Sequence, residues 1–269
     1  MSSARVKIMG VLNVTPDSFS DGGNFATFDT ALSQAEKLIA DGADILDIGG
    51  ESTRPFADPV GTAEELSRVI PIIQAIRKKY DTIISIDTMK ADVAAKALEA
   101  GANIINDVSA LRTDPEMISL VKKTDVPVII MHMQGTPSDM QIKPSYLDVV
   151  EDIVDFFRER IQWITSQGVA RERLILDPGI GFGKTIDHNL SILKKLERFS
   201  SLNLPVLLAH SRKRFLGEIT GVKKESERDV ATAVVASLCA SKGIDMVRVH
   251  DVATTRHALK LAEAINTAL

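Results

Sequence analysis

Polar residues suited to chemistry recur where apolar stretches of the sequence end. Eight short stretches rich in β-branched residues each close on such residues: Asn13, Asp47, Asp87, Asn106, His132, Asp177, His210, and Arg248 with His250. Any one of them could be a helix N-cap or a turn residue, and Asp47 could be a structural carboxylate. Because all eight stretches end alike, the set indicates a binding or catalytic site built from strand ends.

Asp87, Asn106 and Asp177 form a set of hydrogen-bond acceptors with one amide, and few cations are expected near them. A buried carboxylate is costly unless donors meet it. A carboxylate can accept two parallel hydrogen bonds from an aminopyrimidinone edge, so the trio points to a pterin-like or guanine-like ring. Metal coordination is the competing explanation. Against it, no His-x-His closes the first stretch and no His-Glu-x-x-His occurs.

Cationic residues gather in two later segments, "HSRKRF" at 210–215 and "RVHD" at 248–251. They follow the seventh and eighth apolar stretches, the positions at which barrels most often hold phosphate. A run of basic residues such as "RKR" at 212–214 is usually exposed to solvent, but its position after the seventh stretch favours a binding role. The candidate phosphate ligands are Ser211, Lys213, Arg248 and His250.

The segment "DPGIGFGKT", residues 177–185, is similar to a nucleotide P-loop without being one. Pro178 stands where the Walker A pattern requires its first glycine. We expect Asp177 and Phe182 to belong to the site. The three glycines are expected to be backbone devices in a turn: Gly179, Gly181 and Gly183.

The apolar stretches alternate with amphipathic ones from end to end, which is typical of parallel strands joined by crossover helices. Residues 146–168 have the apolar spacing of a helix that Gly168 ends, and residues 63–80 form another, with a kink expected at Pro71. Eight such units predict an α/β fold, a (β/α)8 TIM barrel, as a single domain over residues 1–269. A doubly wound open sheet is the alternative.

Composition narrows the function classes. The formal charge of −4 gives no global positive field, so neither nucleic acid nor an anionic membrane is an expected partner. Cys239, the single cysteine, lies in an apolar helical stretch and is expected to be buried and inert. No signal peptide and no stretch of spanning length occurs, which predicts a cytoplasmic protein.

The chain resembles the dihydropteroate synthase family over nearly its whole length. The matching stretches, in order, are "GVLNVTPDSFSDGG", "DIGGESTRP", "SIDT", "INDVSA", "MHMQG", "LDPGIGFGK", "SRKRF" and "RVHDV". The resemblance implies a (β/α)8 transferase of folate biosynthesis, a homodimer and a target of sulfonamides. Such an enzyme joins p-aminobenzoate to the methylene carbon of 7,8-dihydro-6-hydroxymethylpterin pyrophosphate, with Mg²⁺, giving dihydropteroate and pyrophosphate.

The resemblance also implies roles for particular residues. The pterin would be held by Asp87, Asn106, Met131, Asp177 and Lys213. Pyrophosphate and its Mg²⁺ would be held by Asn13, Arg248 and His250, with Ser211 as a further phosphate ligand. The aminobenzoate pocket would be shaped by Phe19, Thr53, Arg54, Phe182 and Lys213, and the catalytic group would comprise Asp21, Lys213, Arg248 and His250.

This assignment suggests an SN1-like reaction, because the electron-rich pterin can support positive charge on its exocyclic carbon. A carbocation must be protected from water. A loop that carries Asp21 and closes over the site would give this protection. Aniline nitrogen attacks without prior deprotonation, so no strong general base is expected. Phe56 departs from the usual family pattern after "GGESTRP" and puts the contacts of Thr53 and Arg54 in question.

Three other functions remain open. A corrinoid methyltransferase with a pterin-binding barrel could share the acceptor trio, but it has no pyrophosphate to hold. A catalytically silent paralogue could bind pterin alone. A barrel that binds only phosphate is disfavoured by the buried acceptors, which would repel the anion.

Overall fold

The computed structural model describes residues 5–15, 23–52, 58–136 and 139–268. Its parallel strands form a sheet of order β6-β5-β4-β3-β2-β1-β8-β7. An isolated bridge between Leu176 and Val206 joins β6 to the chain just before β7 and brings the two sheet edges together. The strands are β1 (Lys7–Asn13), β2 (Ile45–Gly49), β3 (Ile83–Asp87), β4 (Ile104–Asp107), β5 (Val128–Met131), β6 (Leu174–Asp177), β7 (Leu207–Leu208) and β8 (Met246–Val249).

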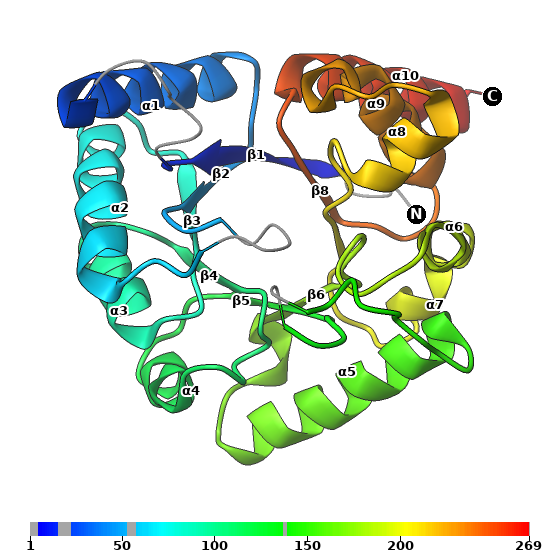
Figure 1. Ribbon diagram of the computed structural model, residues 1–269, viewed down its shortest axis with the longest axis horizontal. Coiled ribbons are helices and arrows are strands. Elements are labelled where there is room, and N and C mark those ends of the chain that lie inside the picture. The colour runs from blue at the N-terminus through cyan, green and yellow to red at the C-terminus, as the bar shows by residue number, and fades with distance from the viewer. Residues whose placement is uncertain (1–4, 16–22, 53–57, 137–138, 269) are drawn as a thin grey trace.

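Helices surround the strands as an outer ring (Figure 1). They are α1 (Gly23–Ala40), α2 (Thr62–Arg77), α3 (Ala91–Glu99), α4 (Pro115–Lys122), α5 (Val149–Ser166), α6 (Ile186–Lys194), α7 (Glu197–Ser200), α8 (Arg214–Thr220), α9 (Asp229–Cys239) and α10 (Val252–Thr267). The predicted (β/α)8 barrel is confirmed, as are both predicted helices, α2 and α5. More than one helix follows β6 and β7, which the strand count alone did not indicate.

The barrel interior positions the polar strand ends. One apolar layer inside it consists of Met9, Ile45, Ile104, Ile129, Ile175, Leu207 and Met246. Side chains alternate between the faces of a strand, so the residue two positions later points inward again, one layer nearer the carboxyl end. Those residues are Asp47, Asn106, Met131, Asp177 and Arg248, together with Val11 on β1.

The helices pack their apolar faces against the outside of the strands. In α5 the buried residues are Val149, Val150, Ile153, Val154, Phe157, Ile161 and Ile164, and the Asp148 side chain caps the first turn. Gly168 follows the helix with φ +96°, the left-handed conformation that favours glycine at a helix end. Cys239 is buried on α9, and burial raises the pKa of its thiol to about 11, as expected for an inert thiol.

The described part of the chain contains no helix that is both long and apolar enough to cross a membrane.

Candidate active site

A largely buried ion-pair network occupies the carboxyl-end layer of the barrel. From β8, Arg248 Nε donates to Asp47 Oδ2 at 2.5 Å, and Arg248 Nη2 donates to Asp87 Oδ2 at 2.8 Å. Asn106 Nδ2 lies 3.2 and 3.3 Å from the two Asp47 oxygens. Asp47 is thus the fully buried carboxylate on which Arg248 and Asn106 converge, in agreement with its interpretation as structural.

The expectation that few cations lie near the acceptor trio is wrong for Asp87. Arg248 reaches it from the opposite end of the sequence, and only closure of the barrel brings the two together. Burial raises the pKa of Asp87 to about 7, and the charge of Arg248 limits that rise. Burial lowers the pKa of Arg248, but attraction to Asp47 and Asp87 outweighs burial and raises it above its usual value.

Asp177, at the end of β6, is held in a tight turn. Its Oδ1 accepts a hydrogen bond from the backbone N–H of Gly179 at 2.8 Å, and burial raises the pKa of the carboxyl to about 6. Gly179 has φ +71°, and a Cβ there would lie 2.0 Å from the carbonyl oxygen of His132. Gly181 and Gly183 also have positive φ, which confirms that these glycines are backbone devices.

A partly apolar wall stands beside the acceptors. Lys213 Nζ lies 4.1 Å from the centre of the Phe182 ring, a cation–π contact. Phe182 packs in a buried cluster with Val108, Met131, Met133 and Met140, against which partly buried Met89 also packs. Three residues predicted for the site, Met131, Phe182 and Lys213, are therefore brought together.

Lys184 is a buried residue that sequence reasoning missed. Its Nζ donates to the Phe182 carbonyl at 2.9 Å, to His132 Nδ1 at 3.0 Å and to the His132 carbonyl at 3.3 Å. Burial lowers the pKa of Lys184 to about 7 and that of His132 to about 2. A neutral His132 therefore joins the end of β5 to the segment that carries Phe182.

The residues predicted to hold pyrophosphate lie at the ends of β1, β7 and β8. Ser211 Oγ lies 2.9 Å from His250 Nδ1 and accepts from the backbone N–H of His250 at 3.1 Å. Asn13 is the last residue of β1 and is partly exposed. His210 is fully buried, and its Nε2 donates to the Thr232 carbonyl at 2.9 Å, so it supports the fold.

Other predicted site residues lie outside the described residues: Phe19, Asp21, Thr53 and Arg54, together with Phe56. Within the described ranges, no group of three or more His, Cys, Asp or Glu side chains is arranged to hold a metal ion.

Fold and site define a (β/α)8-barrel protein with a charged ligand site at the carboxyl ends of its strands. A family model described as "Pterin binding enzyme" matches residues 9–250. The chain belongs to this family and, within it, groups with the dihydropteroate synthases.

Its relatives support that grouping. The dihydropteroate synthase of Streptococcus pyogenes is 48% identical over 246 residues, which is 91% of this chain and 90% of the relative. The dihydropteroate synthase of Bacillus subtilis is 46% identical over 261 residues, which is 97% of this chain and 89% of the relative.

Solved structures agree. The Yersinia pestis enzyme, in complex with a sulfonamide drug, has a TM-score of 0.93 and 42% identity, covering 98% of this chain and 95% of that chain. The Xanthomonas albilineans enzyme in complex with 7,8-dihydropteroate has a TM-score of 0.90 and 40% identity, covering 100% and 97%.

Proposed function

We propose that this protein catalyses the dihydropteroate synthase reaction of folate biosynthesis. It condenses 7,8-dihydro-6-hydroxymethylpterin pyrophosphate with p-aminobenzoate to give 7,8-dihydropteroate and pyrophosphate, and is thus a transferase of an alkyl group other than methyl. One observation carries the proposal: buried Asn106 and Asp177 and largely buried Asp87 sit at the ends of three strands, with Lys213 and Phe182 on the same side of the barrel.

The pterin ring binds at the acceptors. The carboxylates of Asp87 and Asp177 accept from the ring N–H groups, and the Asn106 amide can both donate and accept. Met131 contacts the ring through its thioether, and Lys213 donates from above Phe182. Because these groups are already fixed by Arg248 and Gly179, little reorganisation accompanies binding.

Pyrophosphate departs toward the residues at the ends of β1, β7 and β8: Asn13, Ser211, Arg248 and His250. Negative charge grows on the leaving group as the C–O bond breaks, so preorganised donors lower the barrier. Arg248 contacts Asp87 as well, and therefore lies between the ring and the leaving group.

The exocyclic carbon then carries positive charge until the aminobenzoate nitrogen attacks it. Phe182 and Lys213 form one wall of the aminobenzoate pocket. The other residues proposed for this pocket, Phe19, Thr53 and Arg54, lie outside the described residues. Asp21, which lies outside the described residues, is the proposed counter-charge, because a carboxylate near the cation would stabilise it. No strong base is needed, in keeping with the engagement of His132 and His210 in fold-supporting hydrogen bonds. Sulfonamides would compete for the same pocket.

The donor set fits a Mg²⁺ ion that arrives with the diphosphate. Mg²⁺ keeps several waters and commonly binds through one or two protein ligands plus substrate phosphates. Asn13 can supply one such oxygen. A bound ion would neutralise charge on the departing pyrophosphate.

The surface of α9 and its neighbours supports the proposed homodimer. Exposed apolar side chains recur at four-residue spacing along α9, and α10, which packs along α9 (Figure 1), carries two more. They are Val230, Val234, Leu238, Leu261 and Ile265. A groove of about 450 Å³, lined by residues of α6, α8 and α9, adjoins this face. A second copy of the chain would cover this apolar face.

We also propose that the protein lies in the cytoplasm and acts on small-molecule substrates.

The test is incubation of the purified protein with the pterin pyrophosphate, radiolabelled p-aminobenzoate and Mg²⁺. Asp87→Ala and Lys213→Ala are expected to lower the rate by about 100-fold or more with folding retained. Lys122→Ala, at an exposed lysine on α4, is the matched control and should leave the rate unchanged.

Pyrophosphate binding separates the synthase from a corrinoid methyltransferase. In the synthase, pyrophosphate strengthens pterin binding, as measured by calorimetry. No product together with no effect of pyrophosphate would contradict the proposal, whereas pterin binding strengthened by pyrophosphate without turnover would indicate a silent paralogue.

A further inference from the structure

The segment after β7, residues 210–213, is held from behind by the first turn of α9. Arg212 Nε and Nη2 donate to the two carboxylate oxygens of Asp229, each at 2.7 Å. Thr232 Oγ1 accepts from the backbone N–H of Arg212 at 3.1 Å, and the Thr232 carbonyl accepts from His210 Nε2 at 2.9 Å. Helix α9 thus contacts the segment on both sides of Ser211.

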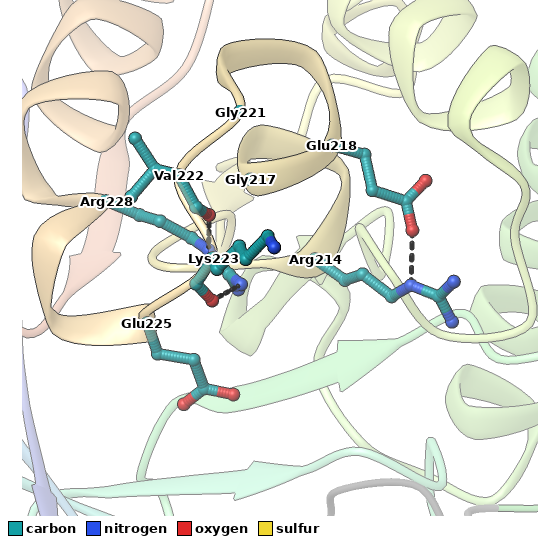
Figure 2. Close-up of a pocket in the computed structure, with 8 residues that line it drawn as sticks. All are labelled: Arg214, Gly217, Glu218, Gly221, Val222, Lys223, Glu225 and Arg228. Atoms are coloured by element: carbon teal, nitrogen blue, oxygen red, sulfur yellow. Dashed lines mark hydrogen bonds and ion pairs between the residues drawn. The ribbon is translucent and has the colours of Figure 1, made fainter.

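Arg228, the residue just before α9, adds a second anchor. Its Nη1 donates to the Arg212 carbonyl at 3.0 Å. Its Nε and Nη2 donate to the carbonyls of Val222 and Lys223 at 3.1 and 2.5 Å (Figure 2). A Cβ on Gly217 would lie 2.5 Å from Arg228 Nε, so the glycine leaves the space that the guanidinium needs.

These bonds surround a strained backbone position. Arg212 has φ +56°, a left-handed conformation that residues other than glycine rarely adopt. Such a conformation persists only where its surroundings fix it. Here the neighbours on either side belong to the site: Ser211 contacts His250, and Lys213 lies over Phe182. Arg212 itself is bound to Asp229.

We propose that Arg212, Asp229 and Arg228 are positioning residues that fix the turn at 210–213 and thereby place Ser211 and Lys213 against the substrates. The inference rests on the proposed function, which gives Ser211 and Lys213 their ligands. Neither Asp229 nor Arg228 is among the residues proposed to bind a substrate. Their effect passes through the backbone at Arg212, so loosening them displaces the Lys213 ammonium from its place above the Phe182 ring.

The matched comparison is between two bidentate ion pairs. Asp229→Asn removes the charge that holds Arg212. Glu151→Gln does the same to the Arg198–Glu151 pair, which joins α7 to α5 on the surface with both N–O distances at 2.9 Å. We expect Asp229→Asn to lower kcat per folded molecule by about 10- to 100-fold, the cost of a misplacement on the order of 1 Å. Glu151→Gln should leave kcat unchanged.

Thermal unfolding and pyrophosphate affinity complete the test. A merely structural pair would lower the melting temperature and leave kcat and pyrophosphate affinity per folded molecule unchanged, which would overturn the inference. If Asp229→Asn yields too little folded protein, Arg212→Lys replaces it, because it keeps the charge but loses the two-pronged geometry. Wild type and Lys213→Ala are assayed in parallel. An inactive wild type contradicts the proposed function, whereas an active wild type with an unimpaired Asp229→Asn contradicts only the positioning role.

Discussion

At the scale of single residues, Arg248 links the two halves of the site: the acceptors Asp87, Asn106 and Asp177, and the proposed pyrophosphate ligands at the ends of β1, β7 and β8. It bonds both Asp47 and Asp87, and about a fifth of its side chain is exposed. Removing one partner of a buried ion pair leaves the other charges uncompensated. Arg248→Met is therefore expected to lower the free energy of unfolding by about 3 to 5 kcal/mol, measured by urea denaturation. Arg198→Met, at a solvent-exposed pair, is the control and should change it little.

Two buried carboxyls should make pterin binding dependent on pH. Burial raises the pKa of Asp87 to about 7 and that of Asp177 to about 6, so both gain protons as the pH falls from 8 to 5.5. A protonated carboxyl loses part of its acceptor capacity, and pterin affinity should fall with the pH. Calorimetry of a pterin at several pH values measures this. Asp177→Asn should bind more weakly and lose the lower part of the pH dependence; an unchanged profile would contradict the assignment of Asp177.

At the scale of elements, the turn after β6 depends on a glycine that no other residue can replace without strain. Gly179→Ala must adopt a left-handed conformation and also meets the His132 carbonyl at 2.0 Å. We expect a loss of about 3 kcal/mol or more in the free energy of unfolding. Gly221→Ala has a similar φ of +76° with nothing within 4 Å, and should lose only about 1 to 2 kcal/mol. If both variants lose the same free energy of unfolding, the close contact of residue 179 with the His132 carbonyl adds no cost, and the prediction is wrong.

Site residues could be predicted from the sequence where they belong to the local pattern of a strand, but not where they depend on contacts between distant strands. Asn106 and Asp177 were found because each lies at or next to the end of an apolar strand, and Asp47 because it interrupts one; such patterns are local in the sequence. The bond from Arg248 to Asp87 spans the closed barrel and leaves no local pattern. Lys184 was missed for the same reason: nothing near it in the sequence distinguishes a buried lysine from an exposed one.

At the scale of the whole molecule, the α/β alternation predicted the barrel because every strand–helix unit repeats the same two periodicities. Strand β7 was predicted, but neither its length of only two residues nor the extra helices after it were, since pairing across the closing edge depends on the rest of the barrel. On α9 the sequence predicted the burial of Cys239 but not which of the other apolar residues share its face. Ala233, Ala236 and Cys239 face inward, and Val234 and Leu238 face outward.

The outward face of α9 gives a prediction about assembly. Val234→Glu would bury a carboxylate without a partner in the proposed dimer, and is expected to raise the dimer dissociation constant on the order of 100-fold or more. Sedimentation measures it. Leu147→Lys, at a fully exposed leucine elsewhere, is the control. A wild-type protein that sediments as a monomer would contradict the dimer itself.

The methionine-rich wall beside Phe182 has a chemical consequence. Met131, Met133 and Met140 are nearly inaccessible, whereas Met89 at the edge of the cluster is only partly buried. Oxidants such as peroxide convert a thioether into a polar, chiral sulfoxide, and the more accessible sulfur reacts first. The cell's reductive repair of sulfoxides would then help to keep this wall apolar, and a bound pterin, by covering it, would shield the protein from oxidative damage.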